Sequence, residues 1–142
     1  MITVVAALIE TDGKLLVCQR RRGDSFALMW EFPGGKKNSN ETEPEALERE
    51  LLEELGAKSC IGDELFRVRH QYPQLGVPIE LVLFAASVDA GAIRNLAFET
   101  MEWRLPADFP GMNFLPADRE VIEKLASGEL SLPRVNRPTD SC

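Results

Sequence analysis

Residues 34–57 read GGKKNSNETEPEALERELLEELGA, and this stretch carries the strongest structural signal in the chain. Seven glutamates lie in it, directly after Pro33. Leu47, Leu51 and Leu55 recur every four residues, which is the spacing of one apolar face on an α-helix. The stretch therefore predicts an amphipathic helix whose other faces are crowded with carboxylates.

Sequence signals mark both ends of this helix. Pro44 suits the first helical turn, where its missing N–H costs no hydrogen bond. Thr42 or Glu43 is then the residue that caps the helix. Gly56 fits the position just after the last turn, where a left-handed backbone conformation is common. We therefore expect the helix to lie between this cap and Gly56.

Three of the glutamates share one face of the predicted helix. Glu50, Glu53 and Glu54 are spaced so that their side chains project on the same side. Like charges so placed destabilise an isolated helix by about a few tenths of a kcal/mol per pair. An acidic helix face is ordinarily solvated surface, but clustered carboxylates also bind hard divalent cations such as Mg²⁺ or Mn²⁺. The spacing of residues over the whole stretch 35–57 decides between a solvated surface and a cation site.

Residues 35–57 resemble the Nudix box, whose pattern is G-x5-E-x7-R-E-U-x-E-E-x-G-U with U an aliphatic residue. Every specified position matches, except that the last aliphatic position holds the small Ala57. A chance match of this quality is expected less than about once in a million chains of this length. Residues 30–36 (WEFPGGK) and 114–118 (FLPAD) extend the resemblance to the MutT-like branch of the family.

The resemblance implies both a fold and an activity. The implied fold is the α/β (α+β) Nudix fold, in which a mixed β-sheet is sandwiched between α-helices. Nudix hydrolases cleave a nucleoside diphosphate linked to another group, and MutT-like members convert nucleoside triphosphates to monophosphates and pyrophosphate. The implied cofactor is Mg²⁺, with Mn²⁺ as a substitute. Such cations bridge phosphate oxygens and let an acidic helix accept a polyanionic substrate.

Residue roles also follow from the resemblance. The implied metal ligands are the carbonyl oxygen of Gly34 and the carboxylates of Glu50, Glu53 and Glu54. The implied catalytic residues are Arg49, Glu50 and Glu53. Arg49 is expected to orient a box glutamate through a charge-assisted hydrogen bond. We expect Glu50 to be the general base, and a glutamate outside the box is the alternative.

Two further acids are candidates for the site. Glu41 is expected nearer the outer shell of the metal. MutT-like proteins often carry another glutamate six residues before the tryptophan that corresponds to Trp103, but that position is Ala97 here. Glu99, two residues later, is a candidate additional acid if the loop shifts. The alternative interpretation is that Glu99 is a solvated loop residue.

Two basic residues are predicted to contact the phosphates. Arg20 and Lys36 match basic positions of MutT-like proteins at equal spacing from the box. Lys36 directly follows the two glycines, which permit close backbone approach.

Asp118 is the predicted base-reading residue, because the resembling segment of the best-known branch has Asn there. An ionised Asp only accepts hydrogen bonds, which favours guanine or cytosine over thymine. A protonated Asp would also donate, and the choice of base would widen. The alternative is an acid in the first turn of the last helix. Phe32 and Leu115 are predicted to line the base pocket, with core positions as their alternative.

The rest of the chain predicts one mixed domain over residues 1–132. Strands are predicted at 2–10, 14–20, 30–32, 60–70, 77–88 and 101–105, and a second helix at 116–125. Asp12-Gly13 predicts a tight hairpin, and residues 72–76 predict a turn between the two longest strands. The polar tail, 133–142, is expected to be disordered.

Composition limits the partners. The chain has 142 residues and a net charge of −7, which disfavours a nucleic-acid polymer as partner. No apolar run approaches the roughly 20 residues of a membrane span, and the N-terminus does not resemble a signal peptide. Three cysteines without CxxC spacing predict free thiols and a cytoplasmic location. A monomer or homodimer with a small-molecule nucleotide substrate is expected.

The leading hypothesis is hydrolysis of nucleoside triphosphates to monophosphate and pyrophosphate, with 8-oxo-dGTP as the substrate removed from the nucleotide pool. The main alternative is CTP, dCTP or a modified cytosine nucleotide. Less favoured are another nucleoside-diphosphate-X substrate and a non-catalytic nucleotide sensor, since a sensor would not need all three acids Glu50, Glu53 and Glu54.

Overall fold

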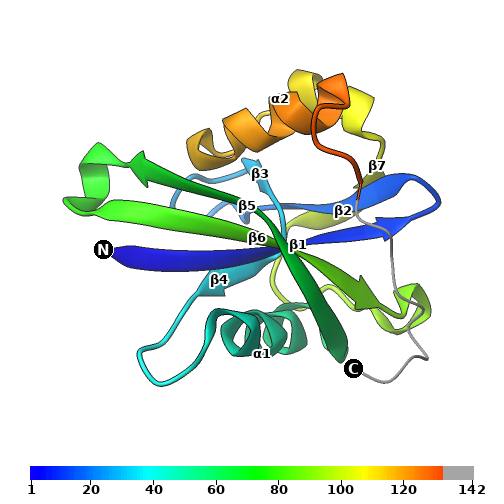
Figure 1. Cartoon of the computed structure of the whole chain (residues 1–142), viewed down its shortest axis with the longest axis horizontal. Helices are drawn as coiled ribbons and strands as arrows, with labels where there is room; N and C mark the ends of the chain where they lie inside the picture. The colour runs from blue at the N-terminus through cyan, green and yellow to red at the C-terminus, as the bar shows by residue number, and fades with distance from the viewer. Residues whose placement is uncertain (133–142) are drawn as a thin grey trace.

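In the computed structural model, which describes residues 1–132, seven strands form a mixed β-sheet with one α-helix on each side (Figure 1). The strands are β1 (Ile2–Thr11), β2 (Lys14–Gln19), β3 (Trp30–Glu31), β4 (Gly34–Lys36), β5 (Ser59–Gln71), β6 (Pro78–Val88) and β7 (Thr100–Arg104). The α-helices are α1 (Glu43–Leu55) and α2 (Arg119–Ser127). Short 3₁₀ segments are η1 (Pro73–Leu75), η2 (Ala90–Ala92), η3 (Pro106–Gly111) and η4 (Pro116–Asp118). The expected mixed sheet between helices is confirmed.

Strand β1 is the centre of the sheet. It pairs in parallel with β6 and antiparallel with β4 and β2. Strand β5 continues the sheet beyond β6, while β3 and β7 pair with β2. The turn from β1 to β2 is the predicted hairpin, in which Asp12 and Gly13 have φ values of 52° and 81°.

Alternate residues of β1 enter two separate cores. Val5 and Ala7 face α1, whose buried residues are Leu47, Leu51 and Leu55. Ala6 and Leu8 face the opposite core, to which α2 contributes Val121, Ile122 and Leu125. Each fully buried leucine contributes about 1.5–3 kcal/mol of hydrophobic stabilisation. The leucine spacing recognised in the sequence therefore fixes which face of α1 packs on the sheet and which face carries the glutamates.

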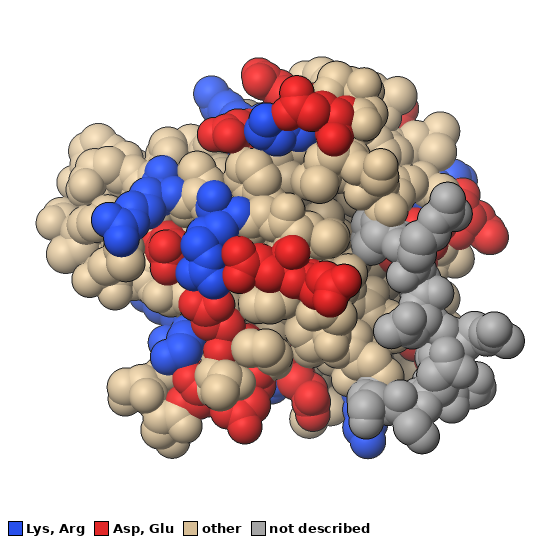
Figure 2. Space-filling model, in the orientation of Figure 1, with Lys and Arg blue, Asp and Glu red and all other residues tan. Residues whose placement is uncertain are grey.

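The ends of α1 are stabilised locally. Thr42, one of the two predicted caps, is the N-cap and forms a capping box with Glu45. Gly56 ends the helix in the left-handed conformation, at φ 65°. Arg67 on β5 forms an ion pair with Glu43 at 2.7 Å and another with Glu80 on β6 at 2.9 Å. Figure 2 shows acidic and basic side chains adjoining one another in this way on one face of the molecule.

Strand β4 was not predicted, because Pro33-Gly34-Gly35 resembles a turn. Instead, Gly34 pairs with Ala6 of β1, and its φ of 153° is accessible mainly to glycine. A Cβ on Gly34 would lie 1.9 Å from the carbonyl oxygen of Val5. Glycine therefore serves here to bring two strands into close contact.

The turn predicted at 72–76 is confirmed and contains the 3₁₀ segment η1. Two other expectations need correction. The helix predicted at 116–125 is divided, because η4 precedes α2 and Asp118 lies at their junction. Cys18 is a free buried thiol, as predicted, but Cys60 is disulfide-bonded. Cysteine spacing did not reveal this, because pairing depends on which residues the fold brings together.

Two remaining expectations concern membranes and the tail. Within residues 1–132, no helix is long and apolar enough to cross a membrane. The disorder predicted for 133–142 falls outside the described residues.

Candidate active site

The glutamate face of α1 lies against strand β4. Glu54 Oε1 accepts a hydrogen bond of 3.0 Å from the backbone N–H of Gly34. The carboxylate of Glu50 lies so close to Gly35 that a Cβ there would be 2.4 Å from its carboxyl carbon. The two glycines therefore have different tasks. Gly34 lets β4 approach β1, and Gly35 makes room for the Glu50 carboxylate.

Arg49 organises the exposed side of this face. Its Nε and Nη2 donate to both oxygens of Glu41, at 3.0 and 2.6 Å. Its Nη1 donates to Glu50 at 3.0 Å and to Glu53 at 3.3 Å. A further bond of 3.0 Å from Nη2 reaches the carbonyl oxygen of Lys36 on β4. The structure thus places Glu41 against Arg49, and this hydrogen bond is the main reason that the pKa of Glu41 falls to about 2.

Glu54 is in the least favourable electrostatic position of the box acids. Burial raises its pKa to about 9, the Gly34 N–H opposes this rise, and the charges of Glu31, Glu50 and Glu53 add to it. A carboxylate that is partly dehydrated and surrounded by other acids strongly favours either a proton or a cation.

The box acids fit a divalent cation by their chemistry, since all their donor atoms are hard oxygens. Within residues 1–132, however, no three acidic, histidine or cysteine side chains already converge closely enough to hold a metal ion. Glu50 and Glu53 are held by Arg49, while Glu54 is held by Gly34. If these glutamates bind a cation, their side chains must first leave these partners.

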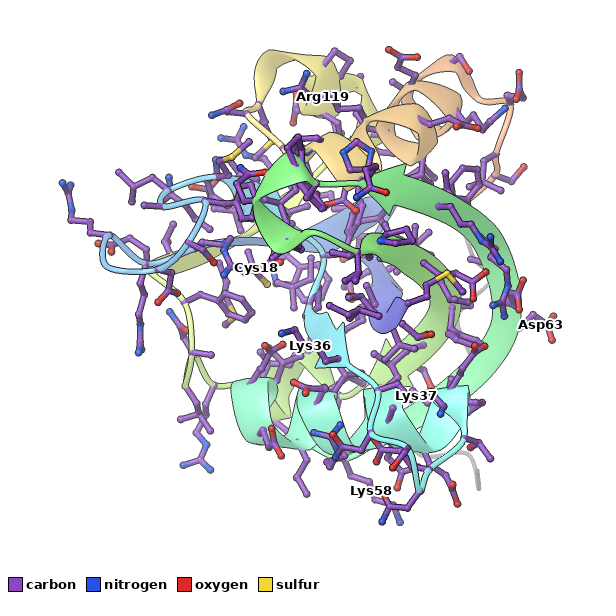
Figure 3. All side chains as sticks on the ribbon, turned by 90° about the vertical axis from the view of Figure 1, so that its left-hand side faces the viewer. Cys18, Lys36, Lys37, Lys58, Asp63 and Arg119 are labelled. Carbon is purple, nitrogen blue, oxygen red and sulfur yellow. The ribbon has the colours of Figure 1, made fainter. Side chains whose placement is uncertain are left out.

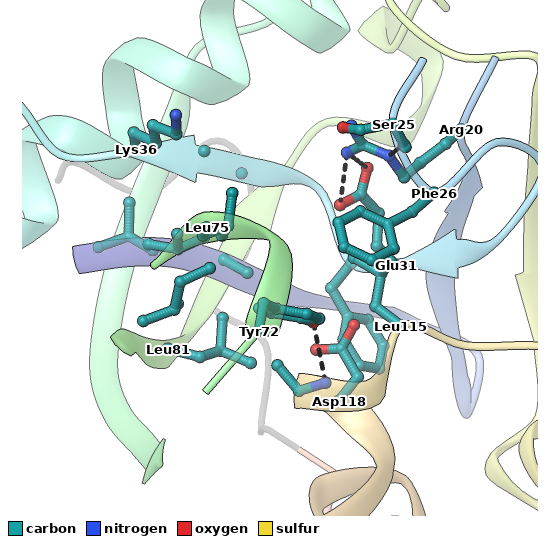
Figure 4. Close-up of a pocket in the computed structure, with 18 of the residues that line it drawn as sticks. Arg20, Ser25, Phe26, Glu31, Lys36, Tyr72, Leu75, Leu81, Leu115 and Asp118 are labelled. Carbon is teal, nitrogen blue, oxygen red and sulfur yellow. Dashed lines mark hydrogen bonds and ion pairs between the residues drawn. The ribbon is translucent and has the colours of Figure 1, made fainter. Parts of the chain in front are cut away.

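A cavity of about 240 Å³ begins at this point and extends across the sheet towards α2 (Figure 4). At its α1 end lie Gly34, Gly35, Lys36 and Glu54. Its other residues include the predicted site residues Arg20, Phe32, Leu115 and Asp118. The fold thus brings residues from four separate parts of the sequence around one cavity.

Some predicted residues lie beside the cavity or away from it. Arg49, Glu50 and Glu53 are on α1, like the lining residue Glu54, but do not line the cavity. Glu99 does not line it either, and its side chain is exposed. This placement agrees with the alternative that Glu99 is a solvated loop residue. Lys36 lines the cavity from β4, where it pairs with Val4 of β1, and Figure 3 labels it on this strand above α1.

Asp118 closes the far end of the cavity. The segment before it is fixed to β3, because the N–H of Trp30 donates to Asn113 and the N–H of Leu115 donates to Trp30, at 2.8 and 2.9 Å. The Asp118 side chain is buried, does not cap α2, and forms no hydrogen bond within residues 1–132. Burial, and then the charge of Glu31, raise its pKa well above the usual range. This shift favours the protonated form more than in an exposed aspartate, and a protonated carboxyl group can both donate and accept.

Arg20 lines the cavity, but its donors are already engaged. Nε donates to the carbonyl oxygen of Ser25 at 2.7 Å, and Nη2 to its hydroxyl at 3.3 Å. Nη1 forms an ion pair of 3.1 Å with Glu31. Burial raises the pKa of Glu31 to about 6, even though Arg20 opposes the rise. These contacts do not test the phosphate contact predicted for Arg20, which stays a prediction.

Phe26, Glu31 and Tyr72 are among the lining residues that were not predicted from the sequence. Glu31 lies inside the WEFPGGK segment that carried the family resemblance, so its position could have been noticed. Phe26 lies in a polar loop and Tyr72 at the end of a strand, and neither has a spacing relation to the box.

Comparison with known proteins identifies the family. A model of the NUDIX domain matches residues 4–124. The chain is 34% identical over 140 residues to a protein named CTP pyrophosphohydrolase from Escherichia coli (strain K12), covering 99% of this chain and 98% of that one. It is 36% identical over 126 residues to a putative 8-oxo-dGTP diphosphatase 2 from Mycobacterium tuberculosis, covering 87% and 86%.

Comparison with solved structures leads to the same family. The solution structure of the E. coli ORF135 protein has a TM-score of 0.73 and 32% identity, covering 91% of each chain. A MutT NUDIX hydrolase from Burkholderia pseudomallei has a TM-score of 0.75 and 28% identity, covering 87% of this chain and 97% of that one. The chain belongs to the NUDIX domain family of hydrolases. Nudix hydrolases generally use divalent metals, so this class of cofactor is expected here as well.

Proposed function

We propose that the protein hydrolyses nucleoside triphosphates to monophosphate and pyrophosphate with Mg²⁺, for which Mn²⁺ can substitute, and that 8-oxo-dGTP is its leading substrate. One observation carries the proposal. A single cavity runs from Glu54 and the β4 glycines, next to the acidic helix face, to the buried Asp118 carboxyl. A nucleotide needs this combination, with cation ligands at one end and a hydrogen-bonding group in an apolar environment at the other.

The acidic end supports the hydrolytic step. Glu50, Glu53, Glu54 and the Gly34 carbonyl would hold the cation. A bound divalent cation supplies Lewis acidity and a water of lowered pKa. Glu50, held by Arg49 at 3.0 Å, is the proposed base that takes the proton of the attacking water. Lys36 is the proposed phosphate contact, since it lines the cavity beside Gly35.

The far end supports recognition of the base. A neutral Asp118 offers one donor and one acceptor side by side. This pattern complements the O6 and N1–H of an oxidised guanine. It also complements the N3 and amino group of cytosine, so a cytosine nucleotide is the second candidate. The O4 and N3–H of thymine present the same pattern as guanine, so discrimination against dTTP has to come from the rest of the cavity. The E. coli relative named CTP pyrophosphohydrolase, which aligns over 98% of its length, favours testing both.

A substrate panel tests the proposal. The protein is incubated with 8-oxo-dGTP, dGTP, CTP, dCTP, dTTP and a nucleotide sugar in Mg²⁺, and monophosphate and pyrophosphate are measured. We expect kcat/KM to be highest for 8-oxo-dGTP or a cytosine nucleotide, and to fall to background when EDTA removes the metal. Equal turnover of dTTP and 8-oxo-dGTP would contradict selective base recognition. Absence of any turnover would indicate a sensor.

A further inference from the structure

Three polar side chains line the cavity from the end of β2, the following loop and β3: Arg20, Ser25 and Glu31. The Arg20 guanidinium holds the other two. Its Nε donates to the carbonyl oxygen of Ser25 at 2.7 Å, and its Nη2 donates to the Ser25 hydroxyl at 3.3 Å. Its Nη1 donates to the two oxygens of Glu31 at 3.1 and 3.4 Å. Arg20 therefore fixes the Ser25 hydroxyl and the Glu31 carboxylate beside one another.

Glu31 lies within electrostatic reach of both ends of the cavity. Burial is the main cause of the raised pKa of Glu54 and of Asp118, and the charge of Glu31 raises both pKa values further. Such an effect weakens with distance. Figure 4 shows Ser25 and Glu31 together on one side of the cavity, apart from Asp118. A nucleotide with its phosphates near Glu54 and its base near Asp118 would therefore carry its sugar past Glu31.

Both side chains retain unused hydrogen-bonding capacity. Within residues 1–132, the Ser25 hydroxyl oxygen accepts only the bond from Arg20, so its own hydrogen is free to donate. The Glu31 carboxylate has about four lone-pair positions and accepts only from Nη1 of Arg20 within the same residues. Burial raises the pKa of Glu31 to about 6, so at pH 8 this group is an ionised acceptor. An acceptor beside a donor matches a hydroxyl group, which can donate to the one and accept from the other.

We propose that Ser25 and Glu31 form a subsite for the sugar of the nucleotide, in which the 3′-hydroxyl donates to the Glu31 carboxylate and accepts from the Ser25 hydroxyl. The inference rests on the proposed function and adds recognition of the sugar. The leading substrate is a 2′-deoxynucleotide, so the 3′-hydroxyl is the sugar group that this subsite can use. Ser25 is exposed and Glu31 is partly buried, whereas Asp118 is buried. This gradient agrees with a sugar that lies nearer to solvent than the base.

Nucleotides that differ in one hydroxyl group test the subsite without turnover. We compare dGMP and dCMP with their 2′,3′-dideoxy analogues by calorimetric titration at pH 8 in Mg²⁺. Loss of a hydrogen bond to a charged group weakens binding by roughly tenfold to a hundredfold. The dideoxy form of the tighter ligand should therefore bind about tenfold more weakly, or worse. The same affinity for both forms, or no binding of either dGMP or dCMP, would overturn the proposal.

Two variants assign the effect to these side chains. Ser25→Ala removes the donor and Glu31→Gln removes the charged acceptor, so each should reduce the ratio of the two dissociation constants to about threefold or less. Both ligands are measured on the same protein, so partial unfolding of a variant lowers both apparent affinities and leaves their ratio unchanged. Ser39→Ala is the matched control, because Ser39 is exposed and does not line the cavity. It should keep the wild-type ratio, and a wild-type ratio in Ser25→Ala or Glu31→Gln would overturn the role of that residue.

Hydrolysis of triphosphates by the wild type is measured separately, which keeps the two proposals distinguishable. Binding that depends on the 3′-hydroxyl, without hydrolysis of any triphosphate, would contradict the proposed function alone. Hydrolysis of 2′-deoxy and 2′,3′-dideoxy triphosphates with equal kcat/KM would contradict the sugar subsite alone.

Discussion

Glu53 is the most exposed of the box carboxylates that contact Arg49, and its side chain is 58% exposed. Its ion pair with Arg49, at 3.3 Å, contributes little to stability because solvent screens it. Glu53→Gln should therefore leave the melting temperature within about 1–2 °C of the wild type. If Glu53 is a metal ligand, kcat should fall by about a hundredfold or more.

Glu48→Gln is the matched control, since Glu48 is an exposed glutamate of the same helix that lies outside the specified box positions. Its kcat should equal that of the wild type. Near-normal turnover of Glu53→Gln at saturating Mg²⁺ would exclude Glu53 as a ligand.

Asp118 provides a test of base recognition. Asn keeps the size, the neutral charge and both hydrogen-bonding functions of the neutral acid, but it places its donor on nitrogen with two hydrogens. Asp118→Asn should therefore change the ratio of kcat/KM between 8-oxo-dGTP and CTP by about twofold to tenfold, the range of one hydrogen bond, and leave kcat for the better substrate nearly unchanged. The measurement is a competition assay with both nucleotides. An unchanged ratio would show that Asp118 does not read the base.

At this scale, the sequence predicted more of the acidic end of the site than of the base end. Glu50, Glu53 and Glu54 could be placed on one face because helical spacing relates neighbours in the chain. Tyr72 and Ala117 are joined by a hydrogen bond across 45 positions, and no local pattern predicts such a contact. Phe26 likewise depends on an unusual backbone conformation that its neighbours enforce.

At the scale of elements, the contact between α1 and β4 depends on two adjacent glycines that should respond differently to substitution. Gly34→Ala places a Cβ 1.9 Å from a backbone oxygen of β1 at a φ that favours glycine. The free energy of unfolding should fall by about 2 kcal/mol or more. Gly35→Ala instead meets the end of the Glu50 side chain, which can move. It should cost about 1 kcal/mol or less in stability but at least tenfold in kcat.

Urea denaturation and steady-state kinetics on both variants provide the measurement. Loss of stability in Gly35→Ala as large as in Gly34→Ala would mean that the Glu50 carboxylate is rigidly fixed. Wild-type kcat in Gly35→Ala would mean that the Glu50 position beside β4 is unimportant for hydrolysis.

The element scale also shows why β4 escaped prediction. Two consecutive glycines after a proline indicate a turn by their local preferences. Here tertiary contact overrides that preference, since only a backbone without side chains can lie between β1 and the Glu50 carboxylate. The long strands and α1 were predicted within one or two residues because leucine periodicity or β-branched runs extend over their whole length, whereas the start of α2 was missed by three residues.

At the scale of the whole molecule, the sheet separates two cores, and residues of both cores line the cavity. Three carboxyl groups with raised pKa values line it: Glu31, Glu54 and Asp118. They come from β3, α1 and the start of α2, so the charge concentration arises only when the fold assembles. Composition predicted an acidic protein, but it could not predict where the acid would be buried.

These buried carboxyl groups predict how the stability of the metal-free protein depends on pH. A carboxyl group whose pKa is higher in the folded state binds more protons when folded, so it stabilises the fold at low pH and loses that effect as pH rises. Glu31, with a pKa of about 6, should lose its contribution between about pH 4.5 and 6, and Glu54, at about 9, between about pH 4.5 and 9. In EDTA, the free energy of unfolding should therefore fall by several kcal/mol from pH 5 to pH 9, at about 1.4 kcal/mol for each pKa unit, and most of the fall should come from Glu54.

Two comparisons test whether ionisation of Glu54 causes this loss of stability. One uses the Glu54→Gln variant, and the other adds Mg²⁺. Gln cannot ionise, so in EDTA the variant should be more stable than the wild type at pH 8 and should show a flatter dependence on pH. A cation bound by the ionised carboxylates stabilises the folded state by about 2.7 kcal/mol at a hundred times its Kd. Saturating Mg²⁺ should therefore raise the wild-type free energy of unfolding and have a smaller effect on Glu54→Gln. Equal stabilisation of both proteins by Mg²⁺ would remove Glu54 from the cation site, and identical pH profiles in EDTA would show that Glu54 is not the buried acid that limits stability.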